Sequence, residues 1–471
     1  MTNVQKDSGT GRFYFNGGTL YARSLNANFM TGLTSAEIKA GGALINSNGF
    51  AITIAQNLIA NATSTGGGLT KSGTGVLTLS GANNYTGATA INAGGITLSG
   101  SLSATSGVTV ANTATLSLAS GSVNSAATTT VNAGGTLSGA GTLGAVNLSG
   151  SMNGTLTVGA LSLANGAALS AGTSGSGTLT ASSLTLGATS ADTSTLNFGV
   201  SALGAITSTL QVNGAVTVNS GAAKVTLGLG SNLANLGTGT YNLINYTGTQ
   251  LADVAAFTWS GTKGGRQVVT MNNGTKSIGV TITADYPLWV GNTSDWSANL
   301  ATANWKLNSD SSATTFQAND TVVFNSSANG ASAGTVNLTA NVSPLSVTFT
   351  GNTLAYTLGS TGGFGIAAGQ LIKSGASALT VNNANSFSGG TTLSGGTLTL
   401  GNGGALGSGS VALNGGTLDL NGQTITNALV LGGGTLAGNA GTVGGVISDG
   451  SASSLAVGSN LTLTAVNTFT G

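Results

Sequence analysis

The sequence predicts an all-β protein, a right-handed parallel β-helix (β-solenoid) that is interrupted once by a junction containing Trp and Asp. Three observations predict it: a loosely kept repeat of about 20 residues, short strands in which apolar residues alternate with Thr or Ser, and glycine-rich corners between them. Glycine makes up 79 of the 471 residues. One coil of such a helix buries its core only by stacking on the coils beside it.

The clearest repeat is a gapless alignment of residues 71–98 with residues 373–400, at a constant offset of 302. Gly-Gly-Thr-Leu begins at Gly395, Gly415 and Gly433, and these spacings of 20 and 18 give the length of a coil. A third copy of the repeat begins at Leu461, so we expect Gly471 to be a boundary of the chain and not a natural terminus. The aligned pairs are expected to share an environment, and they include Lys71 and Lys373, Leu77 and Leu379, Tyr85 and Phe387, and Leu98 and Leu400.

Short strands with glycine corners account for each coil. Residues 76–80 and 397–400 alternate apolar side chains with Thr or Ser, which is the period of a half-buried strand. Gly-Gly, Asn-Gly and Ser-Gly pairs on either side supply corners with positive φ. A membrane barrel needs strands of about 9–11 residues, and a propeller needs blades of about 40–50 residues, so both explain the pattern less well.

The composition divides the chain into three parts. Residues 1–250 read as one β-helix block, and residues 321–471 read as a second block that ends within a repeat. Residues 251–320 read as an irregular junction, because they hold all four Trp residues and nine of the charged residues.

Composition also excludes several classes of function. The chain has no His and no Cys, which excludes the usual zinc, haem and iron–sulfur sites and acid–base catalysis by His. Its 11 Lys and Arg against 10 Asp and Glu give a net charge of +1, which leaves no basic footprint for nucleic acid. Residues 1–30 show no basic segment followed by an apolar one, so a signal peptide is expected outside this chain.

The two aligned segments, residues 71–98 and 373–400, resemble the autotransporter-associated β-strand repeat, also called the passenger-associated transport repeat. That resemblance implies a β-helical passenger of a large exported bacterial surface protein, placed outside the cell or on its surface. It also implies that a translocator or other membrane anchor lies outside this chain. The absence of Cys is in keeping with a passenger that crosses a membrane unfolded. The resemblance says little about a ligand.

The tryptophans of the junction are candidates for glycan contact. Trp289, Trp296 and Trp305 could form a platform for sugar rings, or they could fill the core where the coil stack is disrupted. We favour packing, because aromatic residues mostly serve as packing units.

The charged residues are expected to play structural roles. Asp295, Asp310 and Asp320 could form a calcium or glycosidase site, but no Asp-x-Asp pair is present, and turn capping explains them better. Lys71 and Lys373 share one repeat position and are expected to be solvated residues at the start of a strand. The sequence therefore predicts no catalytic residue, no cofactor and no metal site.

These observations favour a non-catalytic extracellular stalk or adhesin segment over two alternatives. One alternative is a β-helical protein that binds or cleaves polysaccharide. The other is an ice-binding solenoid, for which the Thr pairs at Thr397 and Thr399 and at Thr462 and Thr464 are the signal. Expected partners are host or matrix glycans and further copies of the chain joined end to end into fibres; no small-molecule cofactor is expected.

Overall fold

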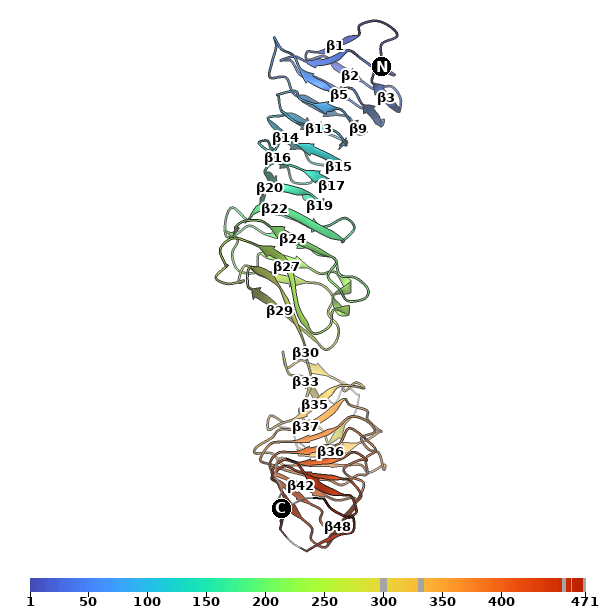
Figure 1. The fold of residues 1–471 in the computed structure, drawn as a ribbon, viewed down its shortest axis with the longest axis vertical. Coiled ribbons are helices and arrows are strands. Elements are labelled where there is room, and N and C mark those ends of the chain that lie inside the picture. Colours follow the sequence, from blue (N-terminus) through green and yellow to red (C-terminus); the bar gives the residue numbers. More distant parts are fainter. Residues whose placement is uncertain (297–302, 329–333, 451–454, 459, 469–471) are drawn as a thin grey trace. The chain divides into compact units, whose positions relative to one another are not determined.

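The computed structural model describes residues 1–296, 303–328, 334–450, 455–458 and 460–468. It confirms the predicted fold class, because parallel sheets stack as a β-solenoid with about 21 turns in all. The chain forms two compact units, residues 1–284 and residues 285–471 (Figure 1). Within the described residues the one helical element is a 3-10 turn, η1 (Ser231–Asn235), and no helix there is long and apolar enough to cross a bilayer.

Two long parallel ladders run through the first unit. In each ladder, a strand pairs with the strand that lies one coil further along the chain. The first ladder contains β2 (Thr19–Tyr21), β5 (Ala43–Asn46), β8 (Leu69–Ser72), β11 (Thr89–Ile91), β14 (Gly107–Val110), β16 (Thr128–Val131), β18 (Val146–Leu148), β20 (Thr157–Leu163), β22 (Gly177–Leu186) and β25 (Val216–Val218). The second contains β3 (Asn26–Met30), β6 (Ile52–Ile54), β9 (Val76–Leu79), β12 (Gly95–Leu98), β15 (Thr115–Val123), β17 (Thr136–Thr142), β19 (Ser151–Gly154), β21 (Ala167–Ala171), β23 (Ser194–Asn197), β26 (Val225–Gly228) and β28 (Phe257–Ser260).

Shorter strands supply a third side of the first unit. They are β1 (Arg12–Phe15), β4 (Ser35–Ile38) and β7 (Leu58–Ala60), and then β10 (Ala82–Asn83), β13 (Ser101–Leu102), β24 (Ser208–Val212) and β27 (Gly239–Tyr246).

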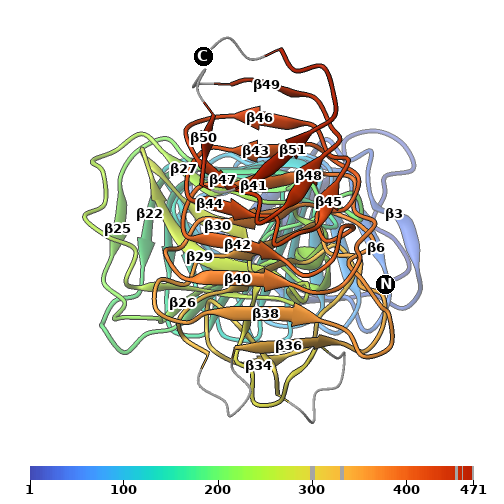
Figure 2. The same ribbon diagram turned by 90° about the horizontal axis from the view of Figure 1, so that it is seen from below.

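The second unit repeats this construction with three sheets. The longest contains β31 (Pro287–Trp289), β33 (Trp305–Leu307), β34 (Ala313–Thr314), β35 (Thr321–Phe324), β37 (Ser346–Phe349), β39 (Leu371–Lys373), β41 (Thr391–Leu393), β43 (Val411–Leu413), β46 (Leu429–Leu431) and β49 (Ile447–Asp449). The next contains β32 (Asp295–Trp296), β36 (Thr335–Leu338), β38 (Tyr356–Gly359), β40 (Ala378–Val381), β42 (Thr397–Leu400), β44 (Thr417–Asp419), β47 (Thr435–Ala437) and β50 (Ala456–Val457). The third contains β45 (Thr424–Ile425), β48 (Gly441–Val443) and β51 (Leu461–Leu463). Figure 2 shows β36, β38, β40, β42 and β44 stacked in one row.

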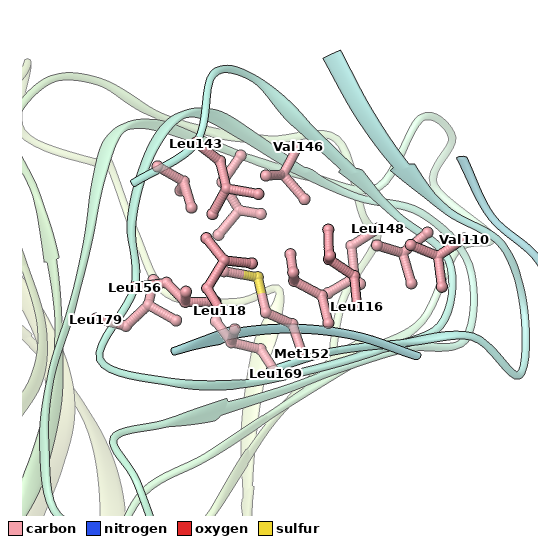
Figure 3. Close-up of a cluster of buried hydrophobic side chains, with 14 of the residues drawn as sticks. Val110, Leu116, Leu118, Leu143, Val146, Leu148, Met152, Leu156, Leu169 and Leu179 are labelled. Carbon is pink, nitrogen blue, oxygen red and sulfur yellow. The ribbon is translucent and has the colours of Figure 1, made fainter. Parts of the chain in front are cut away.

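The predicted coil length is visible in the strand register. Thr397 lies opposite Thr417, and Thr417 lies opposite Thr435, so the Gly-Gly-Thr-Leu copies occupy equivalent positions in successive coils. The leucine that follows each of these threonines is fully buried. Because the apolar residues of each strand point inward, they form aliphatic ladders along the axis, as Leu116, Leu118 and Met152 do in the first unit (Figure 3).

Many corner glycines are required by close packing between coils. A Cβ on Gly75 would clash with the carbonyl oxygen of Phe50 in the preceding coil, and a Cβ on Gly375 would clash with the carbonyl oxygen of Gly351. Coils stack about 4.8 Å apart, so a corner that turns toward its neighbour leaves no room for a side chain. This requirement explains why glycine is so abundant in the chain.

The division between the units falls at Ala284 and Asp285, within the 251–320 stretch that the sequence sets apart as a junction. The first unit ends in antiparallel pairing: β29 (Gln267–Gly274) and β30 (Ser277–Ala284) form a hairpin, and β30 also pairs with β27. The second unit begins in the same way, since β33 pairs antiparallel with both β31 and β34. Parallel stacking therefore gives way to antiparallel strands on either side of this point.

Candidate functional site

The two aligned repeats occupy equivalent places in the two units. Strands β8, β9, β11 and β12 of the first repeat correspond to β39, β40, β41 and β42 of the second. The aligned pairs Leu77 and Leu379, Tyr85 and Phe387, and Leu98 and Leu400 are all buried. This agreement confirms that the segments are equivalent coils, and it makes their shared polar residues the best candidates for a repeated function.

The structure corrects the prediction for the lysines of this repeat. Lys71 and Lys373 were expected at the surface, but their exposed fractions are 0% and 1%. Each lysine occupies an inward position of its strand, two residues after the buried Leu69 or Leu371. The alternation of the strand therefore carries the lysine side chain into the core, where neighbouring coils have aliphatic or aromatic residues.

The buried ammonium groups are held by backbone carbonyls. Lys71 Nζ donates to the carbonyl oxygens of Ser72 and Gly73, both at 2.8 Å, and to that of Ala93 at 3.1 Å. Lys373 Nζ donates to the carbonyl oxygens of Gly375 and, at 3.0 Å, Gly395. Gly73 and Gly375 correspond in the repeat alignment, as do Ala93 and Gly395, so the same cradle is built twice.

Among the described residues, neither lysine forms a salt bridge with a carboxylate, so burial acts on an unpaired ammonium. Desolvation lowers the pKa of Lys71 to about 8. It also lowers the pKa of Lys373. Burial disfavours the charged form of an amine, whereas hydrogen bonds to carbonyl oxygens favour it. The cradle therefore makes a costly buried charge tolerable.

A second polar feature of the repeat differs between the two copies. In the first, Tyr85 Oη lies 2.7 Å from Thr89 Oγ1, which lies 3.2 Å from Thr105 Oγ1. Thr105 Oγ1 lies 3.0 Å from the carbonyl oxygens of both Gly87 and Gly107, which share its single hydroxyl proton. Burial raises the pKa of Tyr85, because the phenolate would be desolvated.

In the second copy Phe387 stands at the position of Tyr85, and the hydroxyl chain is lost. Thr391 corresponds to Thr89 and is buried, but its Oγ1 has no hydrogen-bond partner. An unsatisfied buried hydroxyl costs about 1–3 kcal/mol. The second repeat thus keeps the shape of the first and lacks both hydroxyl contacts that Thr89 makes.

The three tryptophans of the junction lie in the core at the start of the second unit. Trp289, Trp296 and Trp305 have exposed fractions of 0%, 2% and 1%. Trp305 packs edge to face on both of the others, with ring centroids 5.0 and 5.2 Å away, and Phe324 lies within 5.5 Å of all three. Their indole faces are covered by one another, so the rings fill the core here and offer no open platform for sugar stacking.

The carboxylates considered as a calcium or glycosidase site are each bound by nearby groups. Asp310 accepts a hydrogen bond from the backbone N–H of Ser312, and Asp320 accepts one from that of Gln317. Asp295 accepts one from the side chain of Asn337 at 3.0 Å. No group of three or more acidic residues that could hold a metal occurs among the described residues.

Threonine ladders on the outer surface are short. In the second unit Thr335, Thr357, Thr380 and Thr399 stack in four successive coils, and the next residue of the row is Asp419. In the first unit, the outward row of the second ladder has Thr in three successive coils and then Ser or Asn. That row runs through Thr53, Thr78, Thr97, Ser117, Ser138, Asn153, Ser170 and Asn197.

Stacked coils with a repeated internal corner define the class of this protein: it is a repeat-built β-solenoid. The passenger-associated transport repeat family matches residues 69–99 and 371–400, which are the two coils that carry the lysine cradles. The chain therefore contains two such repeats, as the sequence resemblance implied. No curated protein matches the chain.

Proposed function

We propose that this chain is a non-catalytic stalk segment of a large exported bacterial protein and acts as a spacer at the cell surface. The observation that supports the proposal is the coil-on-coil ladder of each unit. A passenger repeat of this family implies exposure outside the cell or on its surface.

The stability and the length of a solenoid spacer are sums of contributions from its coils. Each coil contributes one rung of backbone hydrogen bonds and one layer of buried leucine or valine, and it extends the stack by about 4.8 Å. In the second unit, Thr391, Val411 and Leu429 occupy one inward row in successive coils. The length of such a segment is set by the number of coils, so a whole coil can be removed without disturbing the contacts of the others.

Deletion of a whole coil tests this function. Removing residues 391–410 joins Gly390 to Val411 and preserves the 20-residue register of both long sheets. In the bacterium that makes the protein, antibody labelling of intact cells should persist at the wild-type level. The matched control removes residues 391–400 only, which leaves half a coil, and its labelling should fall. Wild-type protein that is labelled only after cell lysis would contradict the proposal.

A further inference from the structure

We propose that Lys71 and Lys373 set the strand register of the solenoid: each buried ammonium fixes how its coil aligns with the following coil. The proposal goes beyond the stalk function, because it concerns how the correct fold is selected. It assigns a role to the two lysines that are buried within the described residues.

The lysines stand in otherwise apolar inward rows. Lys71 lies between Ile45 of the preceding coil and Ile91 of the following coil. Lys373 lies between Phe349 and Leu393. A methionine or leucine would fill such a position without the cost of burying a charge, and replacing buried charges by apolar residues is often neutral or stabilising. Stability alone therefore gives no reason for a lysine here.

The contacts of the ammonium join two successive coils. Lys71 Nζ reaches Gly73 in its own corner and Ala93 in the corner of the next coil. In the second unit, Gly396 leaves the room for this contact, because a Cβ built on it would lie 2.5 Å from Lys373 Nζ. Gly396 also has a φ of 69°, so glycine is favoured here both by the close approach of Lys373 and by the backbone conformation. The lysine and the glycine corner of the following coil form a matched pair.

Register needs such a device in this chain. A slip of two residues keeps every inward residue inward, because the side-chain period of a strand is two, and glycine-rich strands specify their register weakly. The aliphatic rows thus discriminate poorly between the native and the slipped pairing. A two-residue slip displaces the next corner by about 6.6 Å, which carries the Ala93 carbonyl away from Lys71 Nζ and leaves a buried ammonium with an unfilled donor.

Disulfide trapping measures the register directly, since the chain has no cysteine of its own. Thr70 lies opposite Ala90 on the outer surface, so Thr70→Cys with Ala90→Cys reports the native pairing. Thr70→Cys with Asn92→Cys, or with Ala88→Cys, reports a slip of two residues in either direction. In the native register these diagonal pairs are about 8 Å apart, beyond the Cα separation that a disulfide spans.

The full-length chain is unfolded in denaturant, refolded under oxidising conditions and analysed by mass spectrometry. With Lys71 present, only the native pair should cross-link efficiently. In Lys71→Met, slipped cross-links should rise at least about tenfold, while hydrogen exchange of residues 69–99 stays as slow as in the wild type or becomes slower. Lys224→Met, which removes an exposed lysine of the same unit, is the matched control and should leave the pattern unchanged.

The second unit provides an independent trial. Ile372 lies opposite Thr392, so Ile372→Cys with Thr392→Cys reports the native register, and Ile372→Cys with Ser394→Cys reports the slip. Lys373→Met should raise the slipped cross-link in the same way. Slipped cross-links that stay at the wild-type level in both methionine variants would overturn the proposal. Failure of both variants to fold would also overturn it, because the lysines would then be needed for stability.

Discussion

The two repeats differ at Tyr85 and Phe387, so the hydrogen bond made by Tyr85 in the first repeat can be introduced into the second. Tyr85 Oη lies 2.7 Å from Thr89 Oγ1, whereas Thr391 Oγ1 has no partner beside Phe387. Phe387→Tyr should therefore place a hydroxyl within reach of Thr391. Both aromatic positions are buried, with exposed fractions of 1% and 0%, so the new bond forms away from water.

The expected gain is about 1 kcal/mol, the usual net contribution of one hydrogen bond. It should appear as roughly fivefold slower amide exchange in residues 371–400. Hydrogen exchange is the suitable assay, because the chain has two compact units and a single unfolding midpoint would mix them. Exchange in residues 69–99 serves as the internal reference and should not change.

Tyr85→Phe is the reciprocal variant. It should speed exchange in residues 69–99 by about the same factor, since Thr89 keeps its contact with Thr105 and loses only the tyrosine. It should also remove a loss of stability at high pH. Burial raises the pKa of Tyr85, so above about pH 10 the unfolded state releases a proton that the folded state retains, and stability falls. Unchanged or faster exchange of residues 371–400 in Phe387→Tyr would refute the reasoning.

Three further substitutions test other parts of the fold. Burial lowers the pKa of Lys71 to about 8, against 10.5 in its ordinary state. The unfolded state therefore binds more protons between these values, and the free energy of opening of residues 69–99, measured by hydrogen exchange, should rise from pH 8 to pH 10, a rise that Lys71→Met should lack. Leu398→Ala removes a fully buried side chain from an aliphatic ladder and should lower the free energy of opening of residues 371–400, measured by hydrogen exchange, by about 2–5 kcal/mol. Trp305→Ala should cost about 3–5 kcal/mol in the second unit, while hydrogen exchange of residues 1–284 stays unchanged; Leu203→Ala, at a position that is 97% exposed, is the control and should have almost no effect.

Periodicity made most of the coil architecture predictable. The offset of 302 between the two repeats and the 20- and 18-residue spacings of Gly-Gly-Thr-Leu reappear as strand register in the structure. A coil has no fold of its own, so its sequence has to repeat the same inward positions for its neighbours to cover. This constraint makes the fold of a solenoid easier to predict from its sequence than the fold of a globular domain.

The sequence does not predict the lysine cradles, because the usual solvation of charged strand-start residues and the alternation of this strand point in opposite directions. Charged residues at the start of a strand are commonly solvated, which predicts Lys71 at the surface. The alternation of its strand indicated the opposite, because Lys71 follows the inward Leu69 by two residues, as Lys373 follows Leu371. The acceptors could not be foreseen, since the Ala93 and Gly395 carbonyls lie in the next coil and depend on its register.

The boundary between the units carried a signal of a different kind. Residues 267–284 alternate apolar and polar side chains on both sides of a tight turn at Thr275 and Lys276, which is a hairpin pattern. The surrounding Trp and Asp residues indicate a change of composition but not a hairpin. Antiparallel strands at the end of a parallel stack cover its inward side chains without a further coil. Covering the end of the stack is the role of capping units in solenoids.

The position of the lysines relative to this boundary bears on how the protein folds. Lys71 lies in the first unit and Lys373 in the second, and antiparallel strands interrupt the parallel ladders between them. Register passes from coil to coil only through parallel pairing, so the second unit cannot inherit its alignment from the first. Each unit then needs its own residue that distinguishes the native pairing from a two-residue slip. One buried lysine in each unit, held by equivalent carbonyls, meets that need at the cost of a single buried charge for each stack.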